Sequence, residues 1–218
     1  IMGSGLGYRI SSILTSVAGT SMLLLLVLTM VVSLIMGMGV PTTAAYLVLA
    51  SLVAPTMIQL GIPPLAAHMF IFYFGCISSI TPPVALAAYA GAGLAGCDPN
   101  KTGYKAFRLA FCSFLMPYLF VYNPVLLMEG GVLDILWSLV TALIGAYLLA
   151  SGFEGFFFRW SLKWFERPLM ILGAVMLIVP GMVTDLVGIA IIVVEFVTEF
   201  MFKRSEKFVP VTVSQSTT

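Results

Sequence analysis

The sequence predicts an all-α membrane protein with a re-entrant helical hairpin, a discontinuous transmembrane helix and additional C-terminal transmembrane helices. The first observation behind this prediction is composition. Of the 218 residues, 61% are hydrophobic and 9% are charged, whereas soluble domains average about 25% charged residues. So few polar residues cannot cover a globule in water. The second observation is that glycine and proline interrupt two of the apolar stretches.

Residues 21–58 are predicted to form the hairpin. The apolar stretches 21–39 and 44–58 fall short of, or only just reach, the roughly 20 residues that cross a hydrocarbon core. The segment 37–43, with the sequence Gly-Met-Gly-Val-Pro-Thr-Thr, joins them. Two short arms joined by such a tip are expected to enter and leave the membrane on the same side.

Residues 65–94 are predicted to form the discontinuous helix. The apolar arms 65–80 and 84–94 are separated by Thr-Pro-Pro, and together they are long enough for one crossing. A helix break at membrane depth is costly unless it lines a cavity or binds something, because lipid offers no partner to the freed backbone groups. The alternative for both breaks is an ordinary proline kink that neighbouring helices heal.

Two full spans are expected next, at 107–128, with kinks at Pro117 and Pro124, and at 135–153. Between the second span and the last apolar stretch, residues 154–168 interleave Trp with Arg and Lys. This pattern is typical of an amphipathic loop at the membrane surface.

The last apolar stretch, 169–202, is expected to form a hairpin. Basic residues form three patches, at 101–108, 159–167 and 203–207. The first two patches are separated by two spans and so lie on one side of the membrane. If the third patch lies on the same side, an even number of crossings is required between 169 and 202. One long kinked span is the alternative. Residues 210–218 are expected to be a disordered tail, which leaves 1–130 and 131–209 as the two parts of the chain.

The prolines determine which carbonyl oxygens each break frees. A helical carbonyl at position i accepts a hydrogen bond from the N–H at i+4, and proline has no N–H. Pro41 therefore removes the partner of the Gly37 carbonyl. Pro82 and Pro83 do the same to the carbonyls of Ser78 and Ser79.

Hydroxyl groups lie beside these carbonyls, and no carboxylate lies close to either break in sequence. Neutral oxygens suit a weakly bound monovalent cation such as Na⁺, because a Ca²⁺ site would want Asp or Glu. The hydroxyls belong to Thr42, Thr43, Ser78, Ser79 and Thr81.

Each break is also expected to start a new helix. Pro82 or Pro83 suits a first-turn position, so the amides of residues 84–87 would project from a positive dipole end. The same holds after Pro41. Two such ends facing a midplane cavity would attract an anionic group. The substrate-binding candidates are therefore Thr42, Thr43, Ser79, Pro82 and Pro83.

At these residues the sequence resembles a known family. Residues 37–46 (GMGVPTTAAY) and 80–89 (ITPPVALAAY) are similar to the second-repeat signatures of the large membrane subunit of tripartite ATP-independent periplasmic (TRAP) transporters. Residues 63–68 (PPLAAH) and 122–124 (YNP) resemble the fused permeases that work with TAXI-type binding proteins. The resemblance covers most of residues 3–130, and no motif is recognised beyond 131.

The resemblance implies an elevator-type Na⁺ symporter with two inverted repeats, each holding a Na⁺ site. Residues 1–130 would be the second transport repeat, in a fragment whose upstream part is missing. The ligands of its site would be Gly37, Ser78, Thr81 and Val84, mostly through backbone oxygens. Ser78 replaces the glycine often found at that position. Protons can replace Na⁺ in TAXI-type systems.

The resemblance also implies partners and a location. A periplasmic binding protein would deliver a small organic anion, and a small membrane subunit or a fused N-terminal domain would complete the permease. The location would be the cytoplasmic (inner) membrane of a bacterium or archaeon, with several passes through the lipid bilayer. The net charge of +1 suggests no nucleic acid partner.

Two other classes of function are less consistent with the sequence. An intramembrane enzyme would need a catalytic constellation such as paired Asp, Ser with His, or HExxH, and none is present. A non-transporting scaffold would have no reason to keep two aligned helix breaks. No cofactor is expected beyond the coupling ion, because the three cysteines have no metal-ligand spacing.

Four further polar residues were considered for proton transfer. His68 is expected to be an interfacial, hydrogen-bonded residue, with a proton carrier as the alternative. Asp185, Glu195 and Glu199 lie in an apolar segment, where acids are functional candidates. A charged face near the membrane surface is the favoured interpretation of the two glutamates, and a proton path is the alternative.

Overall fold

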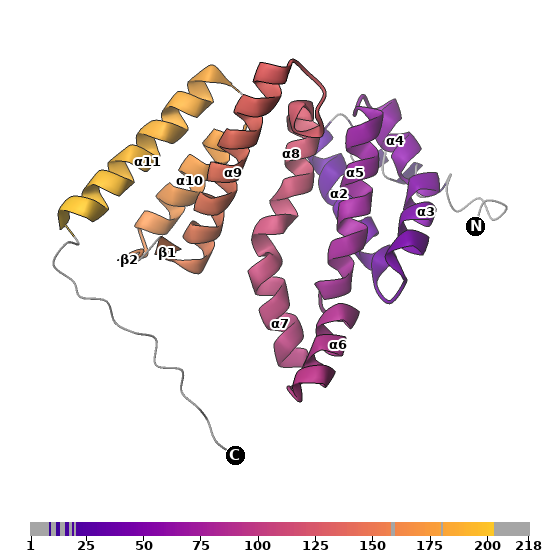
Figure 1. Cartoon of the computed structure of the whole chain (residues 1–218). Helices are drawn as coiled ribbons and strands as arrows, with labels where there is room; N and C mark the ends of the chain where they lie inside the picture. Colours follow the sequence, from indigo (N-terminus) through magenta and orange to yellow (C-terminus); the bar gives the residue numbers. More distant parts are fainter. Residues whose placement is uncertain are drawn as a thin grey trace. The chain divides into compact units, whose positions relative to one another are not determined.

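The computed structural model describes residues 9, 12–13, 16–17, 19, 21–157, 160–179 and 181–202. The described residues are mostly helical, which confirms the all-α class. The chain divides into two compact units, residues 1–135 and 136–218, and Figure 1 shows the helices of each. The tail predicted at 210–218 lies outside the described residues.

The first unit begins with a helix–turn–helix. Helix α2 (Met22–Gly37) starts at Ser21, whose hydroxyl accepts a hydrogen bond from the Leu24 N–H at 3.4 Å. Its 16 residues reach about 24 Å, less than the roughly 30 Å of a hydrocarbon core. After the turn, α3 (Thr42–Leu52) packs against it.

The second arm of this hairpin is itself divided at Val53. Helix α3 ends there, and a short helix α4 (Ala54–Gln59) follows with Pro55 in its first turn. Proline has no N–H to continue the ladder of α3, so the helix must restart.

A long helix that breaks near its middle follows the hairpin. Helix α5 (Pro64–Ile77) ends in the 3₁₀ turn η2 (Ser78–Ile80), and α6 (Leu86–Ala95) starts after a gap. The expectation that a proline occupies the first turn of the new helix was wrong. Proline disfavours helical backbone in the residue before it, and Thr81 is extended accordingly, with φ −97° and ψ 123°.

The single span predicted at 107–128 is also divided. A proline at the start of α8 and another after it interrupt the ladder of i to i+4 hydrogen bonds, so one apolar stretch becomes several short helices. In order they are α7 (Pro99–Ala110), η3 (Phe111–Leu115), α8 (Met116–Tyr122) and η4 (Pro124–Leu127). In Figure 1, α7 runs beside α6 and α8 beside α5.

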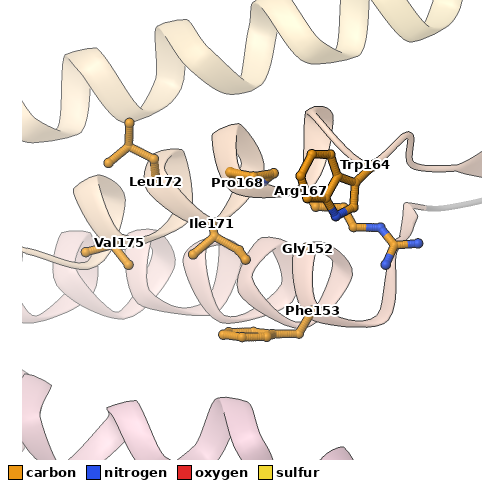
Figure 2. A pocket seen from close by; sticks show the side chains of 8 residues that line it. All are labelled: Gly152, Phe153, Trp164, Arg167, Pro168, Ile171, Leu172 and Val175. Atoms are coloured by element: carbon orange, nitrogen blue, oxygen red, sulfur yellow. The ribbon is translucent and has the colours of Figure 1, made fainter.

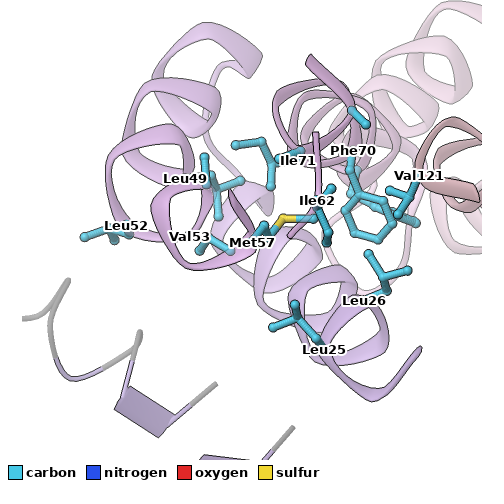
Figure 3. Close-up of a cluster of buried hydrophobic side chains, with 14 residues drawn as sticks. Leu25, Leu26, Leu49, Leu52, Val53, Met57, Ile62, Phe70, Ile71 and Val121 are labelled. Atoms are coloured by element: carbon cyan, nitrogen blue, oxygen red, sulfur yellow. The ribbon is translucent and has the colours of Figure 1, made fainter. Parts of the chain in front are cut away.

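The core of the first unit lies where α2, α3, α4, α5 and α8 meet (Figure 3). Phe70 on α5 is fully buried, and its ring meets Tyr118 of α8 edge-on at 5.3 Å between centroids. Phe74, one turn further along α5, also meets Tyr118 edge-on, at 6.1 Å. These rings fix α5 against α8, so the end of α5 is held firmly where it breaks.

The described part of the second unit contains three helices. Helix α9 (Val132–Glu154) continues from the first unit, and α10 (Glu166–Ile178) and α11 (Met182–Phe202) form a helical hairpin in the stretch 169–202. Gly188 lets α11 approach α10 closely, because a Cβ there would lie 3.1 Å from the Gly173 carbonyl oxygen. The loop expected at 154–168 contains a two-stranded antiparallel hairpin of β1 (Phe156–Phe157) and β2 (Trp160–Ser161).

One helix among the described residues, α9, is long and apolar enough to cross a membrane by itself. The other apolar helical stretches among the described residues are 22–37, 42–52, 64–80, 86–95 and 184–194. The last of these is the described apolar part of α11.

Candidate functional site

The hairpin tip and the break between α5 and α6 are in direct contact. Gly37, the last residue of α2, is buried against Ser78, the first residue after α5. A Cβ added to Gly37 would overlap the Ser78 hydroxyl oxygen and lie 2.9 Å from the Ser78 Cβ. Only glycine permits this approach, so residues 41 positions apart in the chain meet at one point.

The far sides of the two breaks also lie near each other. Gly39 has φ +76°, a backbone conformation that favours glycine. A Cβ at Gly39 would lie 3.7 Å from Cγ1 of Val84. The tip therefore faces the break over several residues, and Gly37, Ser78 and Val84 lie in one region, with Thr81 between the last two in the chain.

The hydroxyls of the break all donate to carbonyls of the preceding turn. Ser78 Oγ donates to the Gly75 oxygen at 2.7 Å, and Ser79 Oγ donates to the Cys76 oxygen at 2.7 Å. Thr81 Oγ1 donates to the Ile77 oxygen at 2.8 Å. Because each hydroxyl donates its hydrogen to a carbonyl of the preceding turn, its oxygen lone pairs remain available to a donor or a cation.

Two of the three carbonyls predicted to be bare, those of Gly37 and Ser78, have weak partners instead. The Gly37 oxygen accepts from the Val40 N–H at 3.4 Å, and the Ser78 oxygen accepts from the Thr81 N–H at 3.2 Å. The prediction overlooked that, at the end of a helix, a carbonyl at position i can accept a hydrogen bond from the N–H at i+3 when the N–H at i+4 is lost. Each carbonyl keeps a second lone pair, so it can still serve as a ligand.

Four helix ends lie near the two breaks. Helix α2 ends at Gly37 and α5 ends at Ile77, so two negative dipole ends converge. Helices α3 and α6 begin at Thr42 and Leu86, and neither has a side-chain cap on its first-turn amides. The arrangement can therefore stabilise a cation between the C-terminal ends and an anion at the uncapped N-terminal ends.

The substrate-binding candidates differ in accessibility. Thr43 and Pro83 are exposed, whereas Thr42, Ser79 and Pro82 are half-buried. By contrast, Ser78 and Thr81 are buried, at 1% and 7% exposure. Three of the four residues predicted for the ion are thus buried, whereas Val84 is half-buried like several of the substrate candidates.

Tyr89 is a residue that the sequence reasoning missed. Its hydroxyl, on α6, donates to the carbonyl oxygen of Pro83 at 2.7 Å. Its ring packs against α7, where a Cβ at Gly103 would lie 3.1 Å from the ring. A signal was present, because Ala-Ala-Tyr follows both breaks, ending at Tyr46 and at Tyr89.

Two buried hydroxyls on α2 were also missed. Thr29 and Ser33 are fully buried, and neither side-chain oxygen has a hydrogen-bond partner among the described residues. With Gly37 they follow a four-residue spacing, which aligns them on one face of the helix. They extend a polar strip from the hairpin tip into the apolar core, and their regular spacing in an apolar helix was the available signal.

The residues considered for proton transfer lie in separate settings. His68 Nδ1 is 3.1 Å from the Tyr46 hydroxyl, which joins α5 to α3. Asp185, in the first turn of α11, accepts a hydrogen bond from Trp137 Nε1 at 2.8 Å. The side chains of Glu195 and Glu199 lie outside the described part of the structure. No group of three or more His, Cys, Asp or Glu side chains that could hold a metal occurs within the described residues.

Comparison with known families agrees with this architecture. The family model of the tripartite ATP-independent periplasmic transporter, DctM component, matches residues 1–135. This range contains both breaks and ends where the first compact unit ends. No curated protein and no solved structure matched the chain. Since the matched range exceeds half of the 218 residues, the chain belongs to the DctM family of membrane-embedded TRAP transporter permeases.

Proposed function

We propose that residues 1–130 form the second transport repeat of an ion-coupled permease of the elevator type, with Na⁺ as the coupling ion. The observation that carries this proposal is the contact of Gly37 with Ser78, which joins the hairpin tip to the helix break. A scaffold protein has no need for two broken elements whose ends meet.

Na⁺ would be held at the convergent C-terminal ends of α2 and α5. The proposed ligands are Gly37, Ser78, Thr81 and Val84, chiefly through backbone oxygens. The hydroxyl of Thr81 supports this assignment, because it donates to the Ile77 carbonyl and keeps its lone pairs free. Neutral oxygens at a negative dipole end suit a monovalent ion that must also be released.

The transported solute would be a small organic anion, such as an organic acid. The uncapped first turns of α3 and α6 support this choice, because free amides at a positive dipole end favour negative charge. The candidates beside those turns are Thr42, Thr43, Ser79, Pro82 and Pro83.

The chain would act with partners in the inner membrane of a bacterium or archaeon. TRAP transporters generally work with a periplasmic binding protein and a small membrane subunit. We propose the same partners here, with a fused N-terminal domain as the alternative to the small subunit. The first repeat would come from a longer protein that contains this chain, and no cofactor beyond the ion is proposed.

Solute uptake by the intact permease and its binding protein in proteoliposomes tests the proposal. Candidate acids are first verified to bind the partner protein. Uptake driven by an inward Na⁺ gradient is the expected result. Uptake that ignores Na⁺ but follows a pH gradient would replace Na⁺ by H⁺ in the same architecture. No uptake from folded protein under either gradient would contradict the transport function.

A further inference from the structure

A cavity in the second unit lies apart from the residues discussed so far. It lies beside α9 and α10, has a volume of about 500 Å³ and is lined mainly by apolar side chains (Figure 2). Gly152 forms part of its wall, because a Cβ there would lie 2.7 Å from Cγ1 of Ile171. Leu172 and Val175 continue the apolar lining along α10.

One end of this cavity carries a positive charge. Arg167, in the first turn of α10, lines the cavity, and its guanidinium packs over Gly155. The Nε atom is buried and has no hydrogen-bond partner among the described residues. Although Nε itself is covered by Gly155, the guanidinium carries a permanent positive charge and four further N–H donors, so this end suits an anionic ligand.

Aromatic side chains mark the same end as lying at a membrane surface. Trp164 lines the cavity and is 88% exposed, and Phe165 beside it is 67% exposed. Tryptophan is enriched at the headgroup level of membranes. The cavity thus has a charged end at the headgroup level and an apolar remainder.

The apolar part is long enough for most of the depth of one membrane leaflet, which is roughly 15 Å. From Arg167 to Val175 the helix advances eight residues, which is about 12 Å. A soluble anion would satisfy Arg167 but would leave the apolar wall uncovered. A lipid with an anionic headgroup matches both ends.

We propose that this cavity is a binding site for an anionic phospholipid, with the phosphate at Arg167 and one acyl chain along Ile171, Leu172 and Val175. The site requires the chain to lie in a membrane but does not depend on which ion drives transport. Failure of the uptake experiment would therefore not count against the proposed lipid site.

Quenching of Trp164 fluorescence tests the site. The intact protein is placed in mixed micelles with phospholipids that carry bromine on the acyl chain, as either phosphatidylglycerol or phosphatidylcholine. Brominated phosphatidylglycerol is expected to quench at about a fivefold lower mole fraction, since one basic residue contributes roughly that much to binding anionic lipid. Trp164→Phe should remove this selective part of the quenching.

Variants at the charged end provide the controls. Arg167→Gln should make the two lipids equal, whereas Arg167→Lys should keep the preference. Lys163→Gln is the matched control, because Lys163 is an exposed cation in the same loop that does not line the cavity.

Three results would overturn the proposal. They are equal quenching by the two lipids in the native chain, a preference that survives in Arg167→Gln, and a preference abolished by millimolar inorganic phosphate. The last would indicate an anion site without a lipid chain. The comparison of lipids on the native chain needs no variant, so a variant that fails to fold cannot rescue the proposal.

Discussion

The absence of a side chain at position 37 sets how closely the two breaks approach. Replacing Gly37 by Ala would push a methyl group into Ser78, and overpacking of this kind costs about 1–3 kcal/mol. We expect Gly37→Ala to lower the initial rate of uptake at least tenfold in proteoliposomes. Gly91→Ala is the control, because nothing lies within 4 Å of a Cβ there. An unchanged rate in Gly37→Ala would contradict the claim that transport depends on this close approach.

Tyr89 fixes the chain between the break and α6 through its bond to the Pro83 carbonyl. Tyr89→Phe keeps the ring against Gly103 but removes the hydrogen bond. We expect a loss of about 1 kcal/mol in the free energy of unfolding and a severalfold lower uptake rate. Thermal unfolding in detergent measures the first quantity. Tyr104→Phe, at an exposed position on α7, should change neither.

At the scale of elements, the proline pair keeps α5 and α6 apart. The double substitution Pro82→Ala and Pro83→Ala restores two N–H donors and permits helical backbone. We expect the two helices to extend toward each other and uptake to be lost, while the amount of folded protein is retained.

Pro64→Ala is the matched control for that experiment. Pro64 is the first residue of α5, where a helix leaves the N–H unpaired in any case. Uptake should stay close to the native rate. A double variant that also transports normally would show that the break itself is not needed.

The second unit contains a bond between elements that can be measured on its own. Trp137 of α9 donates to Asp185 of α11 at 2.8 Å. Hydrogen bonds between membrane helices contribute on average about 0.6 kcal/mol and at most about 1.7 kcal/mol. A double-mutant cycle of Trp137→Phe and Asp185→Ala, each of which removes the bond, should therefore give a coupling free energy of about 1 kcal/mol. Additive effects would mean that the bond does not form.

The sequence predicted the positions of the breaks because proline and glycine act locally. Loss of an N–H at Pro41 or Pro82 follows from covalent structure alone, and the lengths of α2 and α9 follow from runs of apolar residues. The start of α6 at Leu86 was not predicted, because it depends on how far the extended backbone continues beyond the proline pair.

The features that the sequence did not predict depend on tertiary contacts. No local rule brings Gly37 to Ser78, since that contact depends on how α2 packs against α5. The hydrogen bond of Tyr89 and the unpartnered hydroxyls of Thr29 and Ser33 likewise depend on what surrounds each side chain. The division of the span at 107–128 was only partly predicted. Its two prolines predicted kinks, whereas in the structure the stretch is divided into separate short helices.

At the scale of the whole molecule, the chain combines short, paired elements with one long span. Only α9, among the described helices, is long and apolar enough to cross a membrane alone, and its side chains Leu136, Leu139 and Leu143 are exposed. In the first unit, α2 and α5 end at the two breaks, and α3 and α6 begin after them. This is the architecture expected when irregular backbone serves a binding site within the membrane.

Equilibrium binding of radioactive Na⁺ to the purified intact protein tests the central claim, that the hairpin tip and the helix break together hold a cation. Native protein should bind Na⁺ saturably. Thr81→Ala should raise the dissociation constant of one Na⁺ site at least tenfold, which corresponds to about 1.4 kcal/mol. Thr102→Ala is the matched control, because Thr102 Oγ1 makes the same bond to a carbonyl four residues back, at 2.9 Å, on α7. Absence of saturable binding, or binding that Thr81→Ala leaves unchanged, would contradict the account.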